Sequence, residues 1–325
     1  MVMAISSIQL VEVLRSAGEG TRLRILALLA REELAVTELT RVLEQSQPRV
    51  SRHLKLLAEA GLVERFPDGA WMFYRLTSNM PVRGMIDQIL SLVSPKDAVL
   101  IGDARRLAGV DSERAGEATA YFAENAERWD EIRSLYTAEE AVEAAIVEIA
   151  GEGPFERLVD LGSGTGRMLT LLGDRARSAI GLDLSRQMLN IARSHVAAAG
   201  LAACELRHGD VLATGLPAGE ADLVVVHQVL HYLAEPAAAV AEAARLVSHG
   251  GRVLIVDFAP HCLEFLRAEH RHRRLGFADE EIERCLAGAG LSEISIASLP
   301  PAAPGGLTVK IWSAERTAPR VRKAA

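Results

Sequence analysis

Three glycines at alternate positions follow an apolar run in the second half of the chain. The segment LVDLGSGTG (158–166) leads into a helical pattern that contains Met168, Leu169 and Leu172. Glycine permits positive φ and lets a ligand approach the backbone, and a helix start presents free N–H groups. The spacing is neither the G-x-G-x-x-G of dinucleotide-binding enzymes nor a phosphate-binding loop, because no Gly-Lys-Ser/Thr follows. The triplet predicts either a ligand-binding turn or only a tight connection between a strand and a helix.

Two acids lie where the next apolar runs end. Asp183 ends AIGLD (179–183), 17 residues after the last glycine, and its carboxylate can accept both ribose hydroxyls of a nucleoside. Asp210 lies in HGDV (208–211), where it can accept the adenine amino group while Val211 packs near the ring. Either acid alone can be a loop cap, but the carboxyl ends of parallel strands meet at one edge of a sheet. The glycines and the two acids together therefore predict a nucleoside pocket.

A different chemistry is indicated by QPRVSRHLKLLAEAG (47–61). Val50, Leu54 and Leu57 recur at helical spacing on one side, and the cations lie on the opposite side. Such a helix can rest on a core while its arginines bond phosphates or guanine in the major groove of DNA. An ordinary amphipathic helix with a solvated charged face is the alternative. The residues expected at the duplex, two of them in the following hairpin, are Gln47, Arg49, Ser51, Arg52, His53, Lys55, Arg65 and Arg75.

The elements that carry these cations belong to the first part of the chain. Apolar residues at helical spacing predict short helices before residue 60, with Ser46 as the N-cap of the fourth. Residues 62–76 alternate like a hairpin, and residues 81–93 return to helical spacing. Helices followed by a hairpin predict an α+β winged helix-turn-helix domain over residues 1–93. Residues 94–118 have little periodicity and are expected to connect this domain to the rest.

The glycines and acids belong to a second domain, expected over residues 119–314. Residues 119–150 predict two helices, and from Phe155 onwards strand-like runs alternate with helical stretches. This alternation predicts an α/β, Rossmann-like domain with a mostly parallel sheet. Residues 315–325 form a basic tail, to which we assign no function.

Composition excludes several classes of protein. The 325 residues are 49% hydrophobic and 24% charged, which rules out collagen-like and wholly disordered chains. The net charge of −7 is uneven, because residues 1–95 carry +1 and the remainder −8. Three widely spaced cysteines predict no disulfide framework and fit a reduced cytoplasm. No stretch of 18 uncharged apolar residues exists, so we expect a cytoplasmic protein that does not span a membrane.

The first 90 residues or so resemble the ArsR/SmtB family of bacterial repressors. The resemblance rests on TRLRILALL, VTEL, SQPRVSRHLKLLAEAGLV and GAWMFYRL. It implies a homodimer through residues 8–16 and 81–93, and two reading helices on a palindromic operator of double-stranded DNA. Metal-sensing members commonly carry cysteines where this chain has Ala35 and Thr37. We therefore expect no metal site, and the signal must come from elsewhere.

Residues 119–314 resemble class I S-adenosylmethionine (SAM)-dependent methyltransferases, especially the ubiquinone and menaquinone branch. The resemblance rests on VDLGSGTG, GLDLSRQML, HGDV, DLVVVHQVLHYL and RLVSHGGRVLIVDF. It implies a seven-stranded sheet and a site for SAM or S-adenosylhomocysteine (SAH). The residues implied at this site are Asp160, Gly162, Ser163, Gly164, Gly166, Asp183, Leu184, Met188, Asp210, Val211, His227 and Gln228.

Catalytic residues are less clearly indicated. His227, His231 and Tyr232 follow the fourth strand, where this fold holds substrates, and are candidate bases or simply packing residues. Histidines also cluster over 261–272, which we interpret as a solvated face or a basic cover of the pocket rather than a zinc site. The segment 121–136 resembles the lid of this branch. One of its aromatic residues is expected to face the cofactor, with plain packing as the alternative: Tyr121, Trp129 or Tyr136.

Two functions remain open at this point. The first is a transcription factor whose methyltransferase-like domain binds SAM or SAH as an effector. The second is a working methyltransferase of a small molecule with an attached DNA-binding domain. A DNA methyltransferase is disfavoured, because His227-Gln228-Val229-Leu230 stands where base-modifying enzymes carry their motif.

Overall fold

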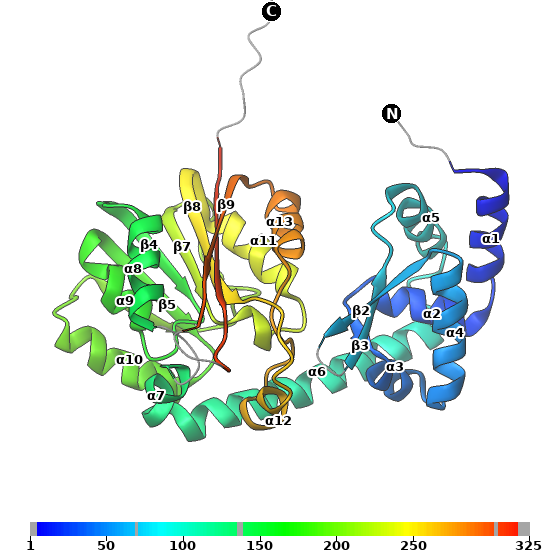
Figure 1. Ribbon diagram of the computed structural model, residues 1–325, viewed down its shortest axis with the longest axis horizontal. Helices are drawn as coiled ribbons and strands as arrows, with labels where there is room; N and C mark the ends of the chain where they lie inside the picture. The colour runs from blue at the N-terminus through cyan, green and yellow to red at the C-terminus, as the bar shows by residue number, and fades with distance from the viewer. Residues whose placement is uncertain (1–4, 69–70, 135–138, 302–304, 318–325) are drawn as a thin grey trace, which may run out of the picture. The chain divides into compact units, whose positions relative to one another are not determined.

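The computed structural model describes residues 5–68, 71–134, 139–301 and 305–317. The chain divides into two compact units, Met1–Gly116 and Glu117–Ala325. Figure 1 shows the first unit in blue to cyan and the second in green to red. Each unit has its own hydrophobic core, and each is described by itself.

The first unit is a winged helix-turn-helix, as the sequence predicts. A three-stranded sheet in the order β1-β3-β2 packs against the helices, and Ser46 is the N-cap of α4. Its core is closed by residues such as Leu39, Leu54 and Ile86, all fully buried. The elements are α1 (Ser7–Ala17), α2 (Gly20–Leu29), β1 (Leu34–Ala35), α3 (Val36–Leu43), α4 (Gln47–Glu59), β2 (Val63–Asp68), β3 (Trp71–Leu76) and α5 (Met80–Ser91).

The expected connection over 94–118 is wrong in one respect, because most of it is helical. The long helix α6 (Ala98–Asn125) begins in this segment, and Leu107 and Val110 belong to the core of the first unit. Asp103 is 1% exposed and accepts two hydrogen bonds of 2.7 Å from the Arg24 guanidinium. A buried acid at a core-facing position hides the apolar periodicity, and this is why the sequence pattern missed the helix.

The second unit is a Rossmann-like α/β domain with the predicted seven-stranded sheet. The strand order is β6-β5-β4-β7-β8-β10-β9, and only β10 runs antiparallel to its neighbours β8 and β9. The order reverses beside β4, which is where such sheets bind ligands. The strands are β4 (Phe155–Leu161), β5 (Ala176–Asp183), β6 (Cys204–His208), β7 (Ala221–His227), β8 (Val247–Phe258), β9 (Ser292–Leu299) and β10 (Val309–Glu315).

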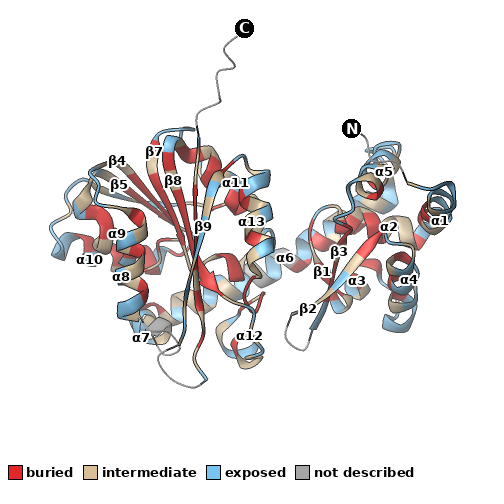
Figure 2. Cartoon of the chain, turned by 45° about the horizontal axis from the view of Figure 1, so that its top comes forward, coloured by how far each residue is buried: buried red, intermediate tan, exposed pale blue. Residues whose placement is uncertain are grey.

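Helices cover both faces of this sheet. Val224 and Val226 of β7 pack towards α11 and α13, whereas Leu223 and Val225 pack towards α8 and α9. Figure 1 shows the two groups of helices on opposite sides, and Figure 2 shows the central strands buried. The helices and short turns are η1 (Ala126–Arg128), α7 (Trp129–Ser134), α8 (Glu139–Ala150), α9 (Arg167–Leu172), η2 (Gly173–Arg175), α10 (Arg186–Ala198), η3 (Leu230–Tyr232), α11 (Pro236–Leu246), α12 (Phe265–His270) and α13 (Asp279–Gly288).

The start of the basic tail is held on the second unit. Arg316 hydrogen-bonds through its backbone to Gly251, and its guanidinium donates to the Val247 carbonyl at 2.8 Å. Residues 318–325 lie outside the described residues. Within the described part of the chain, no helix combines the length and apolar character needed to cross a bilayer.

Candidate ligand and nucleic-acid sites

The glycine loop connects β4 to α9 at the carboxyl edge of the sheet. The N–H groups of Gly162 and Ser163 both donate to the Leu182 carbonyl, at 2.8 and 3.0 Å, which fastens the loop to β5. All three glycines have positive φ: 76° at Gly162, 50° at Gly164 and 84° at Gly166. The loop therefore depends on glycine for its backbone conformation.

The three glycines face different surroundings. A Cβ at Gly162 would lie 2.3 Å from Val229 Cγ2, and one at Gly166 would lie 3.2 Å from Ala192 Cβ, so both are packed against protein. A Cβ at Gly164 would meet only Trp129 Nε1, at 3.8 Å. The central glycine is thus the one with open space beside its Cα.

Asp183 is hydrogen-bonded to this loop. Its two carboxylate oxygens accept the N–H of Gly164 at 2.9 Å and the N–H of Ser185 at 2.7 Å. Burial raises the pKa of the Asp183 carboxyl, and these backbone hydrogen bonds oppose the rise. Near the loop, Ser163 Oγ is buried and has no hydrogen-bond partner among the described residues. The loop and Asp183 therefore offer polar groups that suit a nucleoside ligand.

The other expected nucleoside residues lie around this point. The N–H of Gly209 donates to the Asp183 carbonyl, which places Asp210 beside Asp183. Asp210 is exposed, and its carboxylate accepts the N–H of Leu212 at 2.9 Å. Leu184, the next residue after Asp183, is 46% exposed. The remaining members, Asp160, Met188 and Val211, are buried at or near the ends of β4, β5 and β6.

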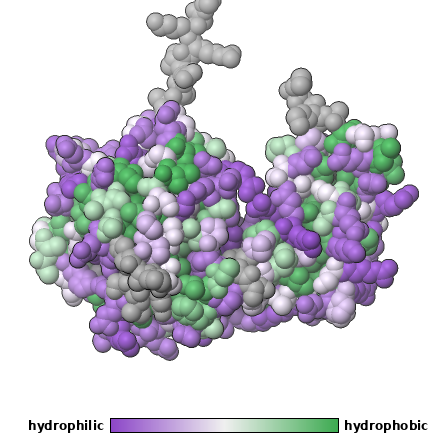
Figure 3. Space-filling view, in the orientation of Figure 1, coloured by the Kyte–Doolittle hydropathy of each residue, from purple (hydrophilic) through white to green (hydrophobic). Residues whose placement is uncertain are grey.

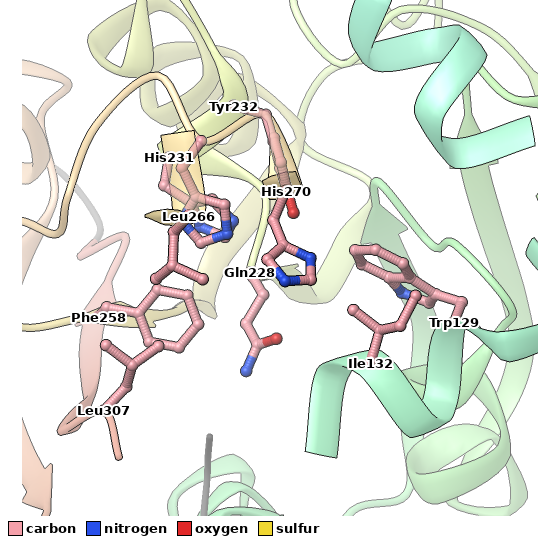
Figure 4. A pocket seen from close by; sticks show the side chains of 10 residues that line it. Trp129, Ile132, Gln228, His231, Tyr232, Phe258, Leu266, His270 and Leu307 are labelled. Atoms are coloured by element: carbon pink, nitrogen blue, oxygen red, sulfur yellow. The ribbon is translucent and has the colours of Figure 1, made fainter. Parts of the chain in front are cut away.

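A pocket lies next to the end of β7. His227 is the last residue of β7, and Gln228 follows with φ of 53°, a left-handed conformation that is rare for glutamine. Gln228 lines a pocket at this edge of the sheet (Figure 4). The other lining residues are Trp129, Ile132, His231, Tyr232, Phe258, Leu266, His270, His272 and Leu307.

A buried histidine–aspartate pair forms part of this pocket. His231 Nδ1 lies 2.8 Å from Asp257 Oδ1, and the exposures of the two residues are 1% and 0%. The backbone N–H of His231 also lies 3.3 Å from the other carboxylate oxygen. Of the three expected catalytic candidates, His231 and Tyr232 line the pocket, whereas His227 is not among its lining residues.

The histidines over 261–272 do not form the solvated face that we favoured. His272 is 8% exposed and its ring centroid lies 4.1 Å from that of His231. His270 Nδ1 is 2.6 Å from the Tyr121 hydroxyl. Sequence reasoning missed Asp257 and His272, because Asp257 reads as part of a strand and His272 as part of a charged run. The one feature of the sequence that could have indicated these two residues is that the histidine-rich run 261–272 follows soon after the end of β8.

The aromatic lid lies over the loop and the pocket. Thr165 Oγ1 donates to Asp130 at 2.8 Å, which holds the start of α7 against the glycine loop. Trp129 lies beside Gly164 and lines the pocket, and Phe122 packs on Tyr232 with 4.8 Å between ring centroids. Tyr136 lies outside the described residues.

The basic face of α4 is exposed in the first unit. Val50, Leu54 and Leu57 are fully buried, which turns the cations outwards as predicted. Arg49 and Arg52 are exposed and make no ion pair within the described part of the chain. The same holds for Arg65 of β2. Gln47 and Lys55 are also exposed, Ser51 is partly buried, and Lys55 lies 3.8 Å from Glu59.

Two of the expected DNA contacts are occupied elsewhere. Arg75 lies 3.2 Å from Glu64 and 3.5 Å from Glu33, and its guanidinium stacks 5.0 Å from the Phe66 ring centroid. His53 Nδ1 lies 3.4 Å from Glu19 Oε2 at the N-terminus of α2. Both side chains thus lie beside acids of their own domain. A contact of Arg75 with the backbone of a duplex stays a prediction and would compete with these ion pairs.

Comparison with known proteins fits the geometry of the first unit. Residues 19–65 match the family model for bacterial regulatory proteins of the arsR family. The arsenic resistance transcriptional regulator ArsR1 of Pseudomonas putida is 41% identical over 103 residues, 30% of this chain and 75% of that protein. The chain belongs to the arsR family. Its ArsR-type DNA-binding domain is fused to a class I methyltransferase domain.

The methyltransferase part of this ArsR-family chain has its own relatives. Residues 159–255 match the family model for a methyltransferase domain. The demethylmenaquinone methyltransferase of Thermus thermophilus is 33% identical over 145 residues, 43% of this chain and 64% of that enzyme, so less than two thirds of its length is spanned. A chain in the complex of the Haloferax volcanii Trm112 methyltransferase activator with a methyltransferase has the same fold, with a TM-score of 0.50 and 21% identity. The match covers 62% of this chain and 98% of that one.

An apolar surface remains on the ArsR-type domain. Val13 and Ala17 of α1 face the core, whereas Ile8, Val11 and Leu14 are 73%, 53% and 49% exposed. Figure 3 shows hydrophobic atoms over the region of α1 and α5. Met80 and Leu92, at the two ends of α5, are also exposed.

Proposed function

We propose that this protein is a transcriptional regulator whose methyltransferase-like unit binds SAM or SAH as its effector. The observation that carries the proposal is the open face of Gly164 beside the carboxylate of Asp183. Open space beside a glycine, next to an acid at the carboxyl edge of a parallel sheet, suits a nucleoside. The effector reading also gives this chain an input in place of the thiolates absent at Ala35 and Thr37.

The chain's own residues have distinct parts in this binding. Asp183 and Leu184 hold the ribose, Asp210 and Val211 the adenine, and the glycine loop the methionine portion. Met188 packs beneath the adenine, and His227 and Gln228 lie towards the sulfur. When bound, SAM supplies an electrophilic methyl group at this position. SAH lacks both the methyl and the positive charge, so the two ligands differ in their interactions with the wall at Trp129.

The helix α6 connects ligand binding to DNA binding. Arg24 and Asp103 hold its first part on the ArsR-type domain, and its last part carries Tyr121 and Phe122 beside the pocket. A ligand that shifts the pocket aromatics acts on a helix that is continuous with the first unit. The shift requires different affinities for the two states of the protein.

The functional form is a homodimer on a palindromic site. The exposed stripe of Ile8, Val11 and Leu14 has the character of an interface with a second copy. Two copies of α4, with Arg49 and Arg52 outwards, then read successive major grooves. Val11→Glu is expected to give monomers in light scattering, whereas Glu12→Gln, also exposed, leaves the mass unchanged.

The effector proposal is tested with the full chain. SAH binding is measured by calorimetry, and fluorescence anisotropy follows binding to a duplex selected from a random pool, with and without SAH. Asp183→Asn should weaken SAH binding by about tenfold or more and leave basal DNA binding unchanged. Asp174→Asn, an exposed acid outside the site, is the control. SAH binding with no change in DNA affinity would remove the effector role.

A second function is favoured by one observation. The His231–Asp257 pair lies in a pocket that shares Gln228 and Trp129 with the nucleoside site. This is the arrangement that a small-molecule methyltransferase needs to position and deprotonate an acceptor. Release of SAH from SAM that depends on an added acceptor would show that the unit is an enzyme.

A further inference from the structure

We propose that Arg106 of α6 fixes the turn between α3 and α4 and thereby positions the reading helix α4 for contact with the bases of DNA. The inference concerns a residue outside both ligand sites, and it names the part of the ArsR-type domain through which α6 acts. It rests on the proposed function only for the response to SAH, because the position of the turn can be tested with DNA alone.

The end of α3 has carbonyl groups that need donors from outside the helix. The last four carbonyls of an α-helix have no partner within it. Two of those in α3 accept the backbone N–H groups of the turn residues Glu44 and Gln45, at 3.3 and 3.2 Å. No backbone N–H of the described chain bonds to the other two, the carbonyls of Val42 and Leu43. These two carbonyls require side-chain donors.

Two arginines supply these donors. Arg106 Nε donates to the Val42 carbonyl at 2.6 Å. Arg24 Nη2 donates to the Leu43 carbonyl at 3.4 Å. Arg106 Nη1 also lies 3.5 Å from the carboxylate of Glu44. Because a guanidinium carries five N–H groups in a rigid plane, one arginine can bind a carbonyl and carboxylates at once. Arg106 thus joins α6 to the last turn of α3 and to the residue that follows it.

The buried carboxylate of Asp103 orients both arginines. Asp103 is 1% exposed and accepts a hydrogen bond of 2.6 Å from Arg106 Nη2 and two of 2.7 Å from Arg24. Charge-assisted hydrogen bonds of this kind are shorter and stronger than neutral ones. Asp103 and Arg106 lie three residues apart on α6, so they occupy one side of the helix. The buried acid therefore holds the Arg106 guanidinium against the turn.

A second link between α3 and α6 is exposed. Arg41 of α3 is paired with Glu113 of α6, and both side chains are more than half exposed. Water screens such a pair, and it contributes little to the position of the helices. The acid that holds Arg106 is buried and is not screened in this way. The polar contribution to the position of the turn therefore comes chiefly from Arg106.

The turn leads directly into the reading helix. α4 begins at Gln47, three residues after Glu44, and its first basic residue, Arg49, is exposed. Ser46, the N-cap, forms no side-chain cap hydrogen bond within the described chain, so α4 is not fixed through its own cap. Hydrogen bonds to base edges carry the sequence specificity, whereas attraction to phosphates is independent of sequence. A shift of the turn should therefore weaken specific binding more than non-specific binding.

The helix that holds the turn also reaches the second unit. α6 continues to Asn125, and its last part carries Tyr121 and Phe122, which contact residues of the pocket. If ligand binding displaces α6, the hydrogen bond from Arg106 transfers the displacement to the Val42 carbonyl and so to the turn. Arg106 is thus a positioning residue for α4.

The test compares Arg106→Gln with Arg105→Gln in the full chain. Each removes one positive charge from α6, but Arg105 is exposed and its side chain makes no ion pair or hydrogen bond in the described part of the chain. Fluorescence anisotropy follows binding to the duplex selected from a random pool and to a duplex of scrambled sequence. We expect Arg106→Gln to bind the selected duplex about tenfold less tightly, and to match Arg105→Gln on the scrambled duplex. Equal losses on both duplexes, or no loss on either, would overturn the inference.

A second variant separates the geometry of Arg106 from its charge. Arg106→Lys keeps the charge, but an ammonium lacks the planar fork that binds the Val42 carbonyl and Asp103 together. We expect this variant to recover only part of the lost discrimination between the duplexes. Full recovery would show that charge alone suffices and would overturn the orienting role.

The fold of Arg106→Gln is checked by circular dichroism. We expect a folded variant, because Asp103 keeps its two hydrogen bonds with Arg24. If Arg106→Gln does not fold, Arg106→Lys takes its place in the comparison, with Arg105→Lys as the control. Unchanged discrimination in Arg106→Lys would then overturn the inference.

The response to SAH separates this inference from the proposed function. Arg106→Gln should bind SAH in calorimetry as the unaltered chain does, because Arg106 lies outside the nucleoside site. We expect the change in DNA affinity that SAH causes to be lost in this variant. An undiminished response would show that α6 acts on DNA binding by another route and would overturn this part of the inference. If SAH leaves the DNA affinity of the unaltered chain unchanged, the effector role fails, and the comparison of the two duplexes still decides whether Arg106 positions α4.

Discussion

The basic face of α4 and the pocket at the edge of the large sheet are built in different ways. Arg49 and Arg52 lie on one helix, three residues apart, and each points outwards because its neighbours Val50 and Leu54 point inwards. The pocket collects residues from position 129 to position 307. A local surface depends on one helix and its periodicity, whereas an assembled site depends on strand order and on many loops. Variants at the two sites should therefore fail differently.

The largest expected effect concerns the stability of the ArsR-type domain, which depends on a pair of residues far apart in the sequence. Asp103→Ala removes the acid that pairs with Arg24 from 79 residues away in sequence. A guanidinium that is largely buried would lose its partner, and we expect the free energy of unfolding to fall by about 3–5 kcal/mol. Urea denaturation measures this, with Asp87→Ala at an exposed ion pair as control. A control loss as large as that of Asp103→Ala would contradict the argument.

The next effect belongs to the assembled site. Gly162→Ala places a Cβ 2.3 Å from Val229 Cγ2 at φ of 76°, so overpacking and backbone strain add to about 3 kcal/mol. Gly200→Ala, at φ of 70° with nothing within 4 Å, should cost only about 1 kcal/mol. Nucleoside binding should be lost in the first variant while DNA binding persists. Equal stability of the two variants would show that the loop relaxes around Val229.

The contrast between local elements and assembled sites also decides how much of the fold could be predicted from the sequence. Helices, the wing hairpin and the strands β4 to β8 follow from periodicity and from Ser46 as a cap, and they are found in the structure. The helix α6 was missed, because Asp103 occupies a core position where the pattern requires an apolar residue. The two-residue strand β1 is too short to produce a period of its own.

The candidate sites divide in the same way. The positions of Asp183 and Asp210 could be predicted, because each follows its own strand and the ends of parallel strands meet. Their binding of a nucleoside stays a prediction. The ion pairs of Arg75 could not be predicted, since its partners Glu33 and Glu64 come from two other segments. His272 was assigned to a charged surface, because nothing in its neighbourhood of sequence shows that Phe258 and His231 cover it.

A smaller effect is expected on DNA binding by the basic face of α4. Arg52→Ala should weaken binding to the selected duplex by roughly tenfold to a hundredfold, the range expected for an arginine that contacts a base. Arg41→Ala removes an exposed arginine of α3 that is paired with Glu113, and should have little effect. Anisotropy at several salt concentrations also distinguishes phosphate contacts, because the loss of one such contact reduces the salt slope by about one. Equal losses from both variants would mean that α4 is not the reading helix.

The smallest effect is expected at Glu242, an acid that has one partner close in the sequence and one far from it. Glu242 of α11 accepts hydrogen bonds from Arg245, one turn away, at 2.7 Å and from the Thr214 hydroxyl, 28 residues away. Arg245 lowers the pKa of Glu242 to about 2, against the opposing effect of burial and with help from Thr214. The ionised form is thus favoured by folding, so its contribution is complete above pH 4.5 and disappears as the pH falls through 2.

Glu242→Gln should therefore reduce stability at pH 7 by about 1–2 kcal/mol, a modest loss because Arg245 remains partly exposed to solvent. The difference from the unaltered protein should shrink on acidification and vanish near pH 2, as followed by urea midpoints across this range. Glu140→Gln, at an exposed position of α8, should show no such convergence. A difference that stays constant with pH would mean that the loss comes from packing, and that the charge of Glu242 does not stabilise this part of the domain.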